Sequence, residues 1–189
     1  MAIKIYIDQG HNPRDFNTGA EGNGLFEQDI TYEIGRRLYN LLLSNPEFEP
    51  RLSRPTPDTV LGTSNSSSLV ARVNEANAWG ADIFVSLHNN AAENSNASGN
   101  EVLTYGPSST VANALAEDIL EQLTLTTGLR NRGIVYRPGL YVLKKTEMPA
   151  VLVEMGFISN PYDAELLSES PYLFSTGIYR GILKYYGLL

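Results

Sequence analysis

Two histidines and two carboxylates in this chain of 189 residues stand where they could form one catalytic site. His11 follows the apolar run IKIYIDQG and His88 follows ADIFVSL, so each comes at the end of a predicted strand. Glu154 ends a third such run, PAVLVE, and Glu27 opens the first predicted helix. Ligands of open α/β sheets bind at the carboxyl ends of the strands, so we expect these four side chains to meet on one rim.

Two imidazoles and one carboxylate that leave a coordination position open are a common ligand set for catalytic zinc. Zinc lowers the pKa of a water that it binds from about 15.7 toward about 7, and it polarises a carbonyl group. A fourth group near that water would act as general base. The chain has no cysteine, so disulfides, thiolate zinc sites and cysteine nucleophiles are excluded. The four residues therefore indicate metal-assisted hydrolysis of a poor electrophile such as an amide.

Each of the four residues also has a purely structural interpretation. Either histidine could be a loop residue whose ring bonds the main chain. Glu27 could serve only as an acidic partner for the positive N-terminal end of its helix. Glu154 is harder to explain in this way, because burial of a carboxylate at the end of a core strand is unfavourable unless the group is paired. The joint pattern is thus a stronger indication than any one residue.

The elements that must position these residues alternate along the chain. Strand patterns occur at residues 3–8, 82–87, 100–105, 140–144 and 150–154, with a weaker one at 48–53. Helical patterns occur at residues 27–46, 66–80, 108–128 and 172–187. This alternation predicts an α/β fold with one domain over residues 1–189. We expect a mostly parallel, twisted sheet of about six strands with helices on both faces.

The composition narrows the class of partner. Hydrophobic residues make up 42% of the chain and charged residues 19%, which are globular values. A formal net charge of −7, without a cluster of lysine and arginine, disfavours nucleic-acid binding. No apolar run of about 20 residues predicts a membrane span. No signal peptide is recognised before the first strand, so action outside the cell would require another export route or a leader since removed.

The motifs taken in order resemble the zinc-dependent N-acetylmuramoyl-L-alanine amidases called type 3 amidases. These are the catalytic domains of bacterial autolysins, spore-lysis enzymes and phage endolysins. The resemblance covers nearly the whole chain, through IYIDQGH, TGAEGNGLFEQD, LSRPTPD, RVNEAN, FVSLHNN, NRGI and MPAVLVEMGFISN. The last motif is the most specific. Two departures lie beside the first histidine, where Gln9 replaces the usual proline and Asn12 replaces a common glycine, and neither is a ligand.

The resemblance implies both a site and a reaction. By it, His11, Glu27 and His88 hold one zinc ion per chain, and Glu154 is the catalytic glutamate. The reaction is hydrolysis of the amide between the lactyl group of N-acetylmuramic acid and the L-alanine that begins the stem peptide. Peptidoglycan is then the partner, the bacterial cell wall is the place of action, and the chain is expected to act as a monomer.

Other interpretations stay open at this point. Asp8, Asn90 and Arg132 would support the ligands or contact the substrate, or would serve only in turn and helix-cap chemistry. A zinc peptidase or deacylase acting on a different wall amide would use the same rim, although the chain lacks an H-E-x-x-H helix. A catalytically silent wall-binding module is disfavoured because all four site residues are retained. A nucleotide-binding domain is disfavoured because neither phosphate-loop motif is present.

Overall fold

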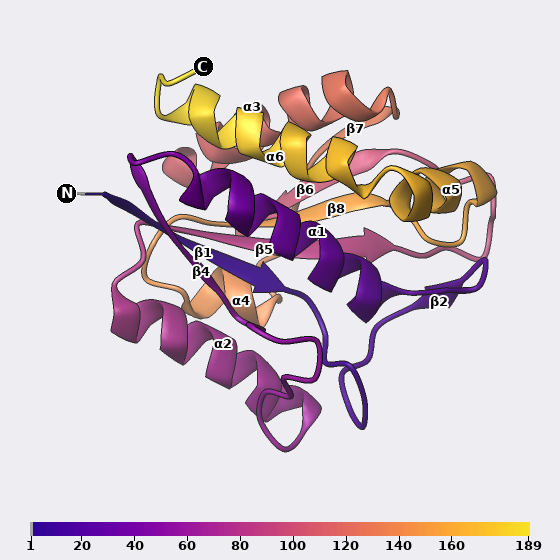
Figure 1. Ribbon diagram of the computed structural model, residues 1–189, viewed down its shortest axis with the longest axis horizontal. Helices are drawn as coiled ribbons and strands as arrows, with labels where there is room; N and C mark the ends of the chain where they lie inside the picture. The colour runs from indigo at the N-terminus through magenta and orange to yellow at the C-terminus, as the bar shows by residue number, and fades with distance from the viewer. Residues whose placement is uncertain (1) are drawn as a thin grey trace.

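The structure, a computed structural model that describes residues 2–189, is an α/β domain with a central sheet between two layers of helices (Figure 1). Within these residues, the main sheet has six strands, in the order β4 (Phe48–Leu52), β1 (Ile3–Gln9), β5 (Ile83–Asn90), β8 (Ala150–Phe157), β6 (Asn100–Thr104) and β7 (Asn131–Tyr136). The strands from β4 to β8 are parallel, and β6 and β7 run in the opposite direction. The expected fold class is confirmed.

Helices cover both faces of the sheet, as expected. One layer holds α1 (Glu27–Leu43), α3 (Thr110–Thr127), α5 (Pro161–Glu169) and α6 (Pro171–Tyr185). The other layer holds α2 (Asn65–Trp79) and the short helix α4 (Tyr141–Lys145), on the lower side of the sheet in Figure 1. Successive side chains of a strand point to opposite faces. Ile5 and Ile7 of β1 therefore join the larger core, and Tyr6 joins the smaller one.

The ends of α2 follow from local sequence. Ser64 precedes the helix, and its side chain accepts a hydrogen bond from the main-chain N–H of Ser67. The hydroxyl of Ser67 in turn accepts a hydrogen bond from the N–H of Ser64, which satisfies a second free donor. Gly80 ends the helix with a φ of 67°, a left-handed conformation that glycine adopts without steric penalty.

The strand predicted at residues 140–144 is wrong, because Tyr141–Lys145 forms the helix α4. The run LYVL is too short for its periodicity to distinguish a strand from one helical turn. Val142 and Leu143 are both buried, although neighbouring residues of a strand would point to opposite faces. Lys144 and Lys145 then lie in the last turn, where positive charge is favourable.

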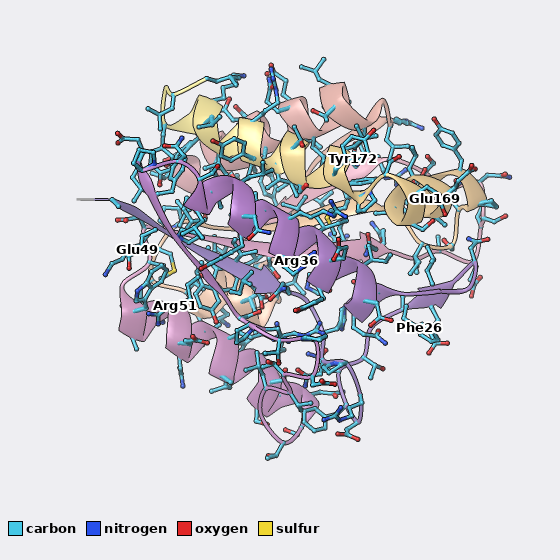
Figure 2. The ribbon with its side chains drawn as sticks, viewed as in Figure 1. Phe26, Arg36, Glu49, Arg51, Glu169 and Tyr172 are labelled. Atoms are coloured by element: carbon cyan, nitrogen blue, oxygen red, sulfur yellow. The ribbon has the colours of Figure 1, made fainter. Side chains whose placement is uncertain are left out.

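Four elements were missed by the sequence patterns, namely β7, α5 and the two short strands of a hairpin. Strand β7 lies at the edge of the sheet and is little buried, so its apolar signal is weak. Helix α5 begins with Asn160 as its cap and Pro161 in its first turn. A hairpin joins β2 (Glu21–Gly22) to β3 (Leu25–Phe26) through an Asn-Gly turn, a known hairpin signal. Phe26 of this hairpin and Glu169 of α5 lie toward the same edge of the molecule (Figure 2).

No helix within residues 2–189 combines the length and the apolar character needed to cross a bilayer.

Candidate metal centre

The sheet brings two of the expected site residues together. His88 on β5 and Glu154 on β8 are register partners on neighbouring parallel strands. Side-chain alternation places both on the face of the sheet that α2 and α4 cover. Both strands extend further than the sequence pattern indicated, to Asn90 and to Phe157. The two residues therefore lie within strands, not at or beyond their ends, and inherit the rigidity of the sheet.

Glu27 joins the two histidines. Its Oε1 lies 3.0 Å from Nε2 of His11 and 3.0 Å from Nδ1 of His88. Oε1 also accepts a hydrogen bond from the main-chain N–H of Asn89 at 2.9 Å, and Oε2 accepts one from the N–H of Ala20 at 2.8 Å. Ligand atoms from the three side chains all lie within 4.8 Å of one another. The three residues that the resemblance named as ligands thus converge on one point.

The chemistry of this donor set fits a metal cation. Nδ1 of His11 lies 3.2 Å from both the main-chain and the side-chain oxygen of Asn17. Both oxygens are acceptors, so Nδ1 carries a proton and Nε2 can present a lone pair toward Glu27. Burial alone would raise the pKa of Glu27, but hydrogen bonds and charge from the two histidines hold that pKa well below its usual range. An ionised carboxylate beside two imidazole nitrogens needs protons or a divalent cation between them.

The main chain of His11 is held in an unfavourable conformation. Its φ is 71°, and the left-handed region costs a non-glycine residue about 1–3 kcal/mol. Arg72 of α2 donates from Nη2 to the carbonyl oxygen of His11 at 2.6 Å and from Nη1 to that of Gln9 at 2.7 Å. Asp8 is paired with Arg72 and accepts a hydrogen bond from the hydroxyl of Ser86 at 2.7 Å. Asp8 therefore contacts the arginine that binds this loop.

The two departures from the family pattern are built into the same loop. Gln9 is buried, its Oε1 accepts from the N–H of Arg54 at 2.9 Å, and its Nε2 donates to the carbonyl of Tyr32 at 3.2 Å. Asn12 is buried as well, and its side-chain amide exchanges two hydrogen bonds of 3.1 Å with the main chain of Leu61. Both residues thus tie the loop to neighbouring segments.

Glu154 occupies a poorly solvated position beside this cluster. Its Oε2 is buried and has no hydrogen-bond partner within residues 2–189. Burial, followed by the negative charges of Glu27 and Glu101, raises the pKa of Glu154 to about 8. A carboxyl group with a pKa near neutrality is suited to accept and return a proton at the pH where most enzymes work.

Glu101, which the sequence patterns did not single out, connects the remaining expected residues. It is the register partner of Glu154 on β6. Its Oε1 accepts a hydrogen bond from Nδ2 of Asn90 at 2.9 Å, and its Oε2 accepts one from Nε of Arg132 at 3.1 Å. Asn90 and Arg132 therefore meet next to Glu154, whereas Asp8 lies with Arg72. A carboxylate at the start of the apolar run VLT, within a predicted strand, was a signal comparable to that of Glu154.

Arg72 and Asn17 are further site residues to which the sequence patterns assigned no role. Arg72 is 1% exposed although arginine is rarely buried without a partner, and it lies in an apolar helical pattern. An arginine at that position could therefore have been recognised from the sequence as a site residue. Asn17 could not, because asparagine is common in loops.

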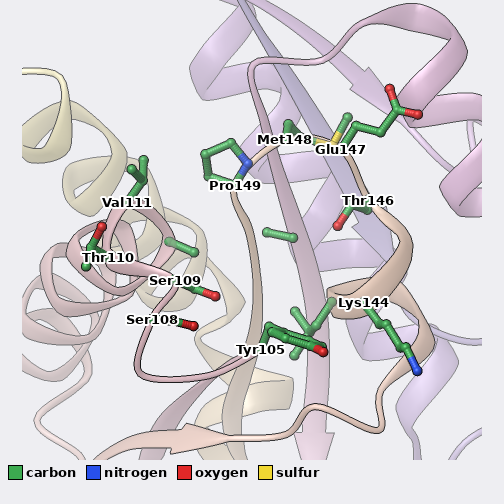
Figure 3. A pocket seen from close by; sticks show the side chains of 13 residues that line it. Tyr105, Ser108, Ser109, Thr110, Val111, Lys144, Thr146, Glu147, Met148 and Pro149 are labelled. Atoms are coloured by element: carbon green, nitrogen blue, oxygen red, sulfur yellow. The ribbon is translucent and has the colours of Figure 1, made fainter.

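A separate hollow of about 370 Å³ lies away from this chemistry (Figure 3). It is formed by the start of α3, near Ser109 and Val111, and by the segment that includes Lys144 and Met148. None of the residues expected from the sequence to form the site lines it. The metal cluster is therefore the stronger candidate for the functional site.

Comparisons with known proteins agree with this geometry. Residues 5–184 match the model of the N-acetylmuramoyl-L-alanine amidase family. The chain is 39% identical over 186 residues to N-acetylmuramoyl-L-alanine amidase LytC of Bacillus subtilis (strain 168), covering 96% of this chain and 35% of that protein. It is 38% identical over 178 residues to N-acetylmuramoyl-L-alanine amidase CwlM of Bacillus licheniformis, covering 92% and 64%. The chain thus spans only part of these relatives.

Solved structures show the same fold. An N-acetylmuramoyl-L-alanine amidase from Clostridium difficile 630 superposes with a TM-score of 0.88 at 28% identity, covering 98% of this chain and 97% of that one. The catalytic domain of the amidase CwlV from Bacillus (Paenibacillus) polymyxa var. colistinus gives a TM-score of 0.86 at 30% identity, covering 99% of each chain. On the family match and these likenesses, the chain belongs to the N-acetylmuramoyl-L-alanine amidase family.

Proposed function

We propose that this chain hydrolyses the amide between the lactyl group of N-acetylmuramic acid and the L-alanine of the peptidoglycan stem peptide, with one zinc ion per chain. The observation that carries the proposal is the convergence of His11, Glu27 and His88 within 4.8 Å, beside the strand position of Glu154. Family membership supports the choice of this amide. We further propose that residues 1–189 form the catalytic domain and that it acts as a monomer on the bacterial cell wall.

We assign the metal to His11, Glu27 and His88. Zinc accepts nitrogen and oxygen donors and commonly has three protein ligands in hydrolases. When bound, zinc supplies Lewis acidity, which lowers the pKa of water and polarises a carbonyl. Asn17 orients the ring of His11, and the N–H groups of Ala20 and Asn89 orient the carboxylate of Glu27. Such outer partners fix both the ring tautomer and the ligand direction.

We assign proton transfer to Glu154. Its carboxylate takes a proton from the attacking water while oxygen bonds to the carbonyl carbon of the amide. It returns that proton to the amide nitrogen when the carbon–nitrogen bond breaks. The products are a carboxylic acid on the lactyl group and a free amino terminus on L-alanine. An Oε2 without a protein partner, and a pKa that burial raises above that of an exposed carboxyl group, both suit a group that must hold a proton between the two steps.

We assign contact with the substrate to Asn90 and Arg132. Glu101 accepts hydrogen bonds from both and lies opposite Glu154, so the two side chains are held at the reacting rim. An arginine oriented by a carboxylate can bind carbonyl or carboxylate groups of a peptide. Arg132 also lies with its guanidinium carbon 4.8 Å from the ring centroid of Phe157, which restricts its motion further.

The test is digestion of purified peptidoglycan, followed by identification of every new amino terminus and reducing end. The expected product is new N-terminal L-alanine, abolished by a chelator and restored by zinc. New termini at another stem or bridge position would replace the amidase assignment with a zinc peptidase. No new termini on several wall types would favour a wall-binding module that lacks catalysis.

A further inference from the structure

A small apolar pocket lies beside the two histidines. Its volume is about 180 Å³, and the rings of His11 and His88 form part of its wall. The rest is mainly apolar, with contributions from α2, from the start of α4 and from β8, namely Leu69, Leu140, Val142 and Leu152. The mis-predicted segment at residues 140–144 therefore forms one side of this pocket, since its helical turn directs these residues toward the metal cluster.

The charged side chains of the pocket wall, Asp8 and Arg72, form hydrogen bonds with each other and with neighbouring protein groups. Arg72 gives its terminal nitrogens to Asp8 and to the carbonyl oxygens of Gln9 and His11. Asp8 accepts a further hydrogen bond from Ser86. These groups offer a ligand little free charge, so the pocket should select apolar groups.

We propose that this pocket is a specificity subsite for a –CH(CH₃)–CO– unit that flanks the scissile amide. The inference rests on the proposed function, because that substrate carries two such units. One is the lactyl group on the acyl side of the bond, and the other is the alanyl residue on the amine side. The methyl group packs against Leu69, Leu140 and Leu152, next to the rings of His11 and His88.

The size of the pocket agrees with this occupant. An apolar protein cavity of about 150 Å³ holds one benzene molecule, which has six heavy atoms. A lactyl or alanyl unit has a similar number of heavy atoms, about five, whereas a sugar ring with its substituents is much larger. The unit would lie next to the metal ligands because the histidine rings are shared between the pocket and the cluster.

The experiment compares three soluble muramyl peptides with zinc-loaded protein. The first has the natural lactyl and L-alanyl units, the second has a glycolyl group in place of the lactyl group, and the third has glycine in place of L-alanine. A methyl group lost from an apolar subsite lowers kcat/KM by about 10–200-fold. We expect a loss in this range for one of the two truncated peptides, and that peptide identifies the unit that occupies the pocket.

Pocket-filling variants then test whether the preference for the natural peptide over the truncated one depends on the pocket. Leu69→Phe on α2 and Leu140→Phe before α4 each fill the space from a partly buried position, so one can replace the other if a fold is disturbed. Both should reduce the preference for the natural peptide to within a few fold. The matched control is Leu125→Phe on α3, where the leucine is 71% exposed on the other layer of helices. It should keep the wild-type preference.

Equilibrium binding gives a second readout. Glu154→Gln protein should bind the natural peptide with a lower Kd than the truncated one, and the pocket-filling variants should remove that difference. Equal cleavage of all three peptides, or a full preference retained in both phenylalanine variants, would overturn the subsite while the amidase assignment stands. Failure of the wild-type protein to cleave the natural peptide would instead overturn the proposed function, and the subsite with it.

Discussion

The Nη2 atom of Arg72 donates to the main-chain carbonyl oxygen of His11 at 2.6 Å. The buried guanidinium of Arg72, on α2, therefore binds the main chain of a proposed metal ligand. The φ of that ligand, His11, is 71°, which is unfavourable for a non-glycine residue. The same guanidinium binds the carbonyl oxygen of Gln9 and the carboxylate of Asp8. A guanidinium can reach these three acceptors together because its N–H groups point in different fixed directions. The ammonium group of a lysine cannot reproduce this arrangement.

Arg72→Lys should therefore weaken zinc binding more than it disturbs the fold. The positive charge beside Asp8 is retained, but the hydrogen bonds to Gln9 and His11 are not all kept. Loss of a group that orients a metal ligand lowers affinity by about 10–100-fold. Competition for zinc against a chromophoric chelator measures this directly. Arg36→Lys is the matched control, since Arg36 lies on the outer surface of α1 with its side chain 48% exposed (Figure 2). If the Arg72→Lys protein binds zinc with unchanged affinity, the loop that carries His11 keeps its conformation without the hydrogen bonds from Arg72.

Glu154→Gln should separate catalysis from metal binding. Glutamine has nearly the same shape but takes no proton, so kcat should fall by about 10²–10⁴-fold, the usual contribution of a general base. Bound zinc, counted by atomic absorption, should stay at one per chain. Glu169→Gln, an exposed position on α5, should change neither quantity. A Glu154→Gln enzyme within a few fold of the wild-type rate would assign the proton to another group.

The stability of the metal-free protein should fall as the pH rises from about 4.5 to about 8. Below this range Glu154 is protonated in both the folded and the unfolded chain and has no effect. Within it the unfolded chain ionises first, because burial and nearby carboxylates raise the pKa of folded Glu154 to about 8. The unfolded state then binds fewer protons, so the free energy of unfolding decreases with pH, in total by an amount on the order of 5 kcal/mol.

Urea unfolding of chelator-treated protein at several pH values measures that trend. Glu154→Gln should remove this part of the pH dependence and be more stable than wild type at pH 8. Other titrating groups, such as Asp8, whose pKa the Arg72 charge and hydrogen bonds hold low despite burial, contribute equally to both proteins and cancel in the difference. If the free energy of unfolding changes with pH in the same way for both proteins, the pKa of Glu154 in the folded protein is not raised.

The motifs were sufficient to predict the fold class and the convergence of His11, Glu27 and His88, but not every strand of the sheet or the residues around the cluster. Polar residues in apolar runs, such as His88 and Glu154, are detectable because burial makes them costly. Strand β7 and helix α4 were not recognised because an edge strand is little buried and a four-residue apolar run has no defined period. The contacts of Glu101 with Asn90 and Arg132 depend on β6 running antiparallel to β8, a choice of direction that no local pattern records.

Gly10→Ala should disturb the metal centre through packing alone. A Cβ atom at Gly10 would lie 2.5 Å from the carbonyl oxygen of Leu87 and 2.6 Å from the ring of His88, so either β1 shifts from β5 or the imidazole turns. Overpacking of this kind lowers the free energy of unfolding by about 1–3 kcal/mol. Zinc affinity should fall as well, because the ring is a proposed ligand. Gly139→Ala, where a Cβ would meet nothing within 4 Å, is the control and should be neutral. If Gly10→Ala binds zinc and resists urea like wild type, the close approach of the two strands is not what positions His88.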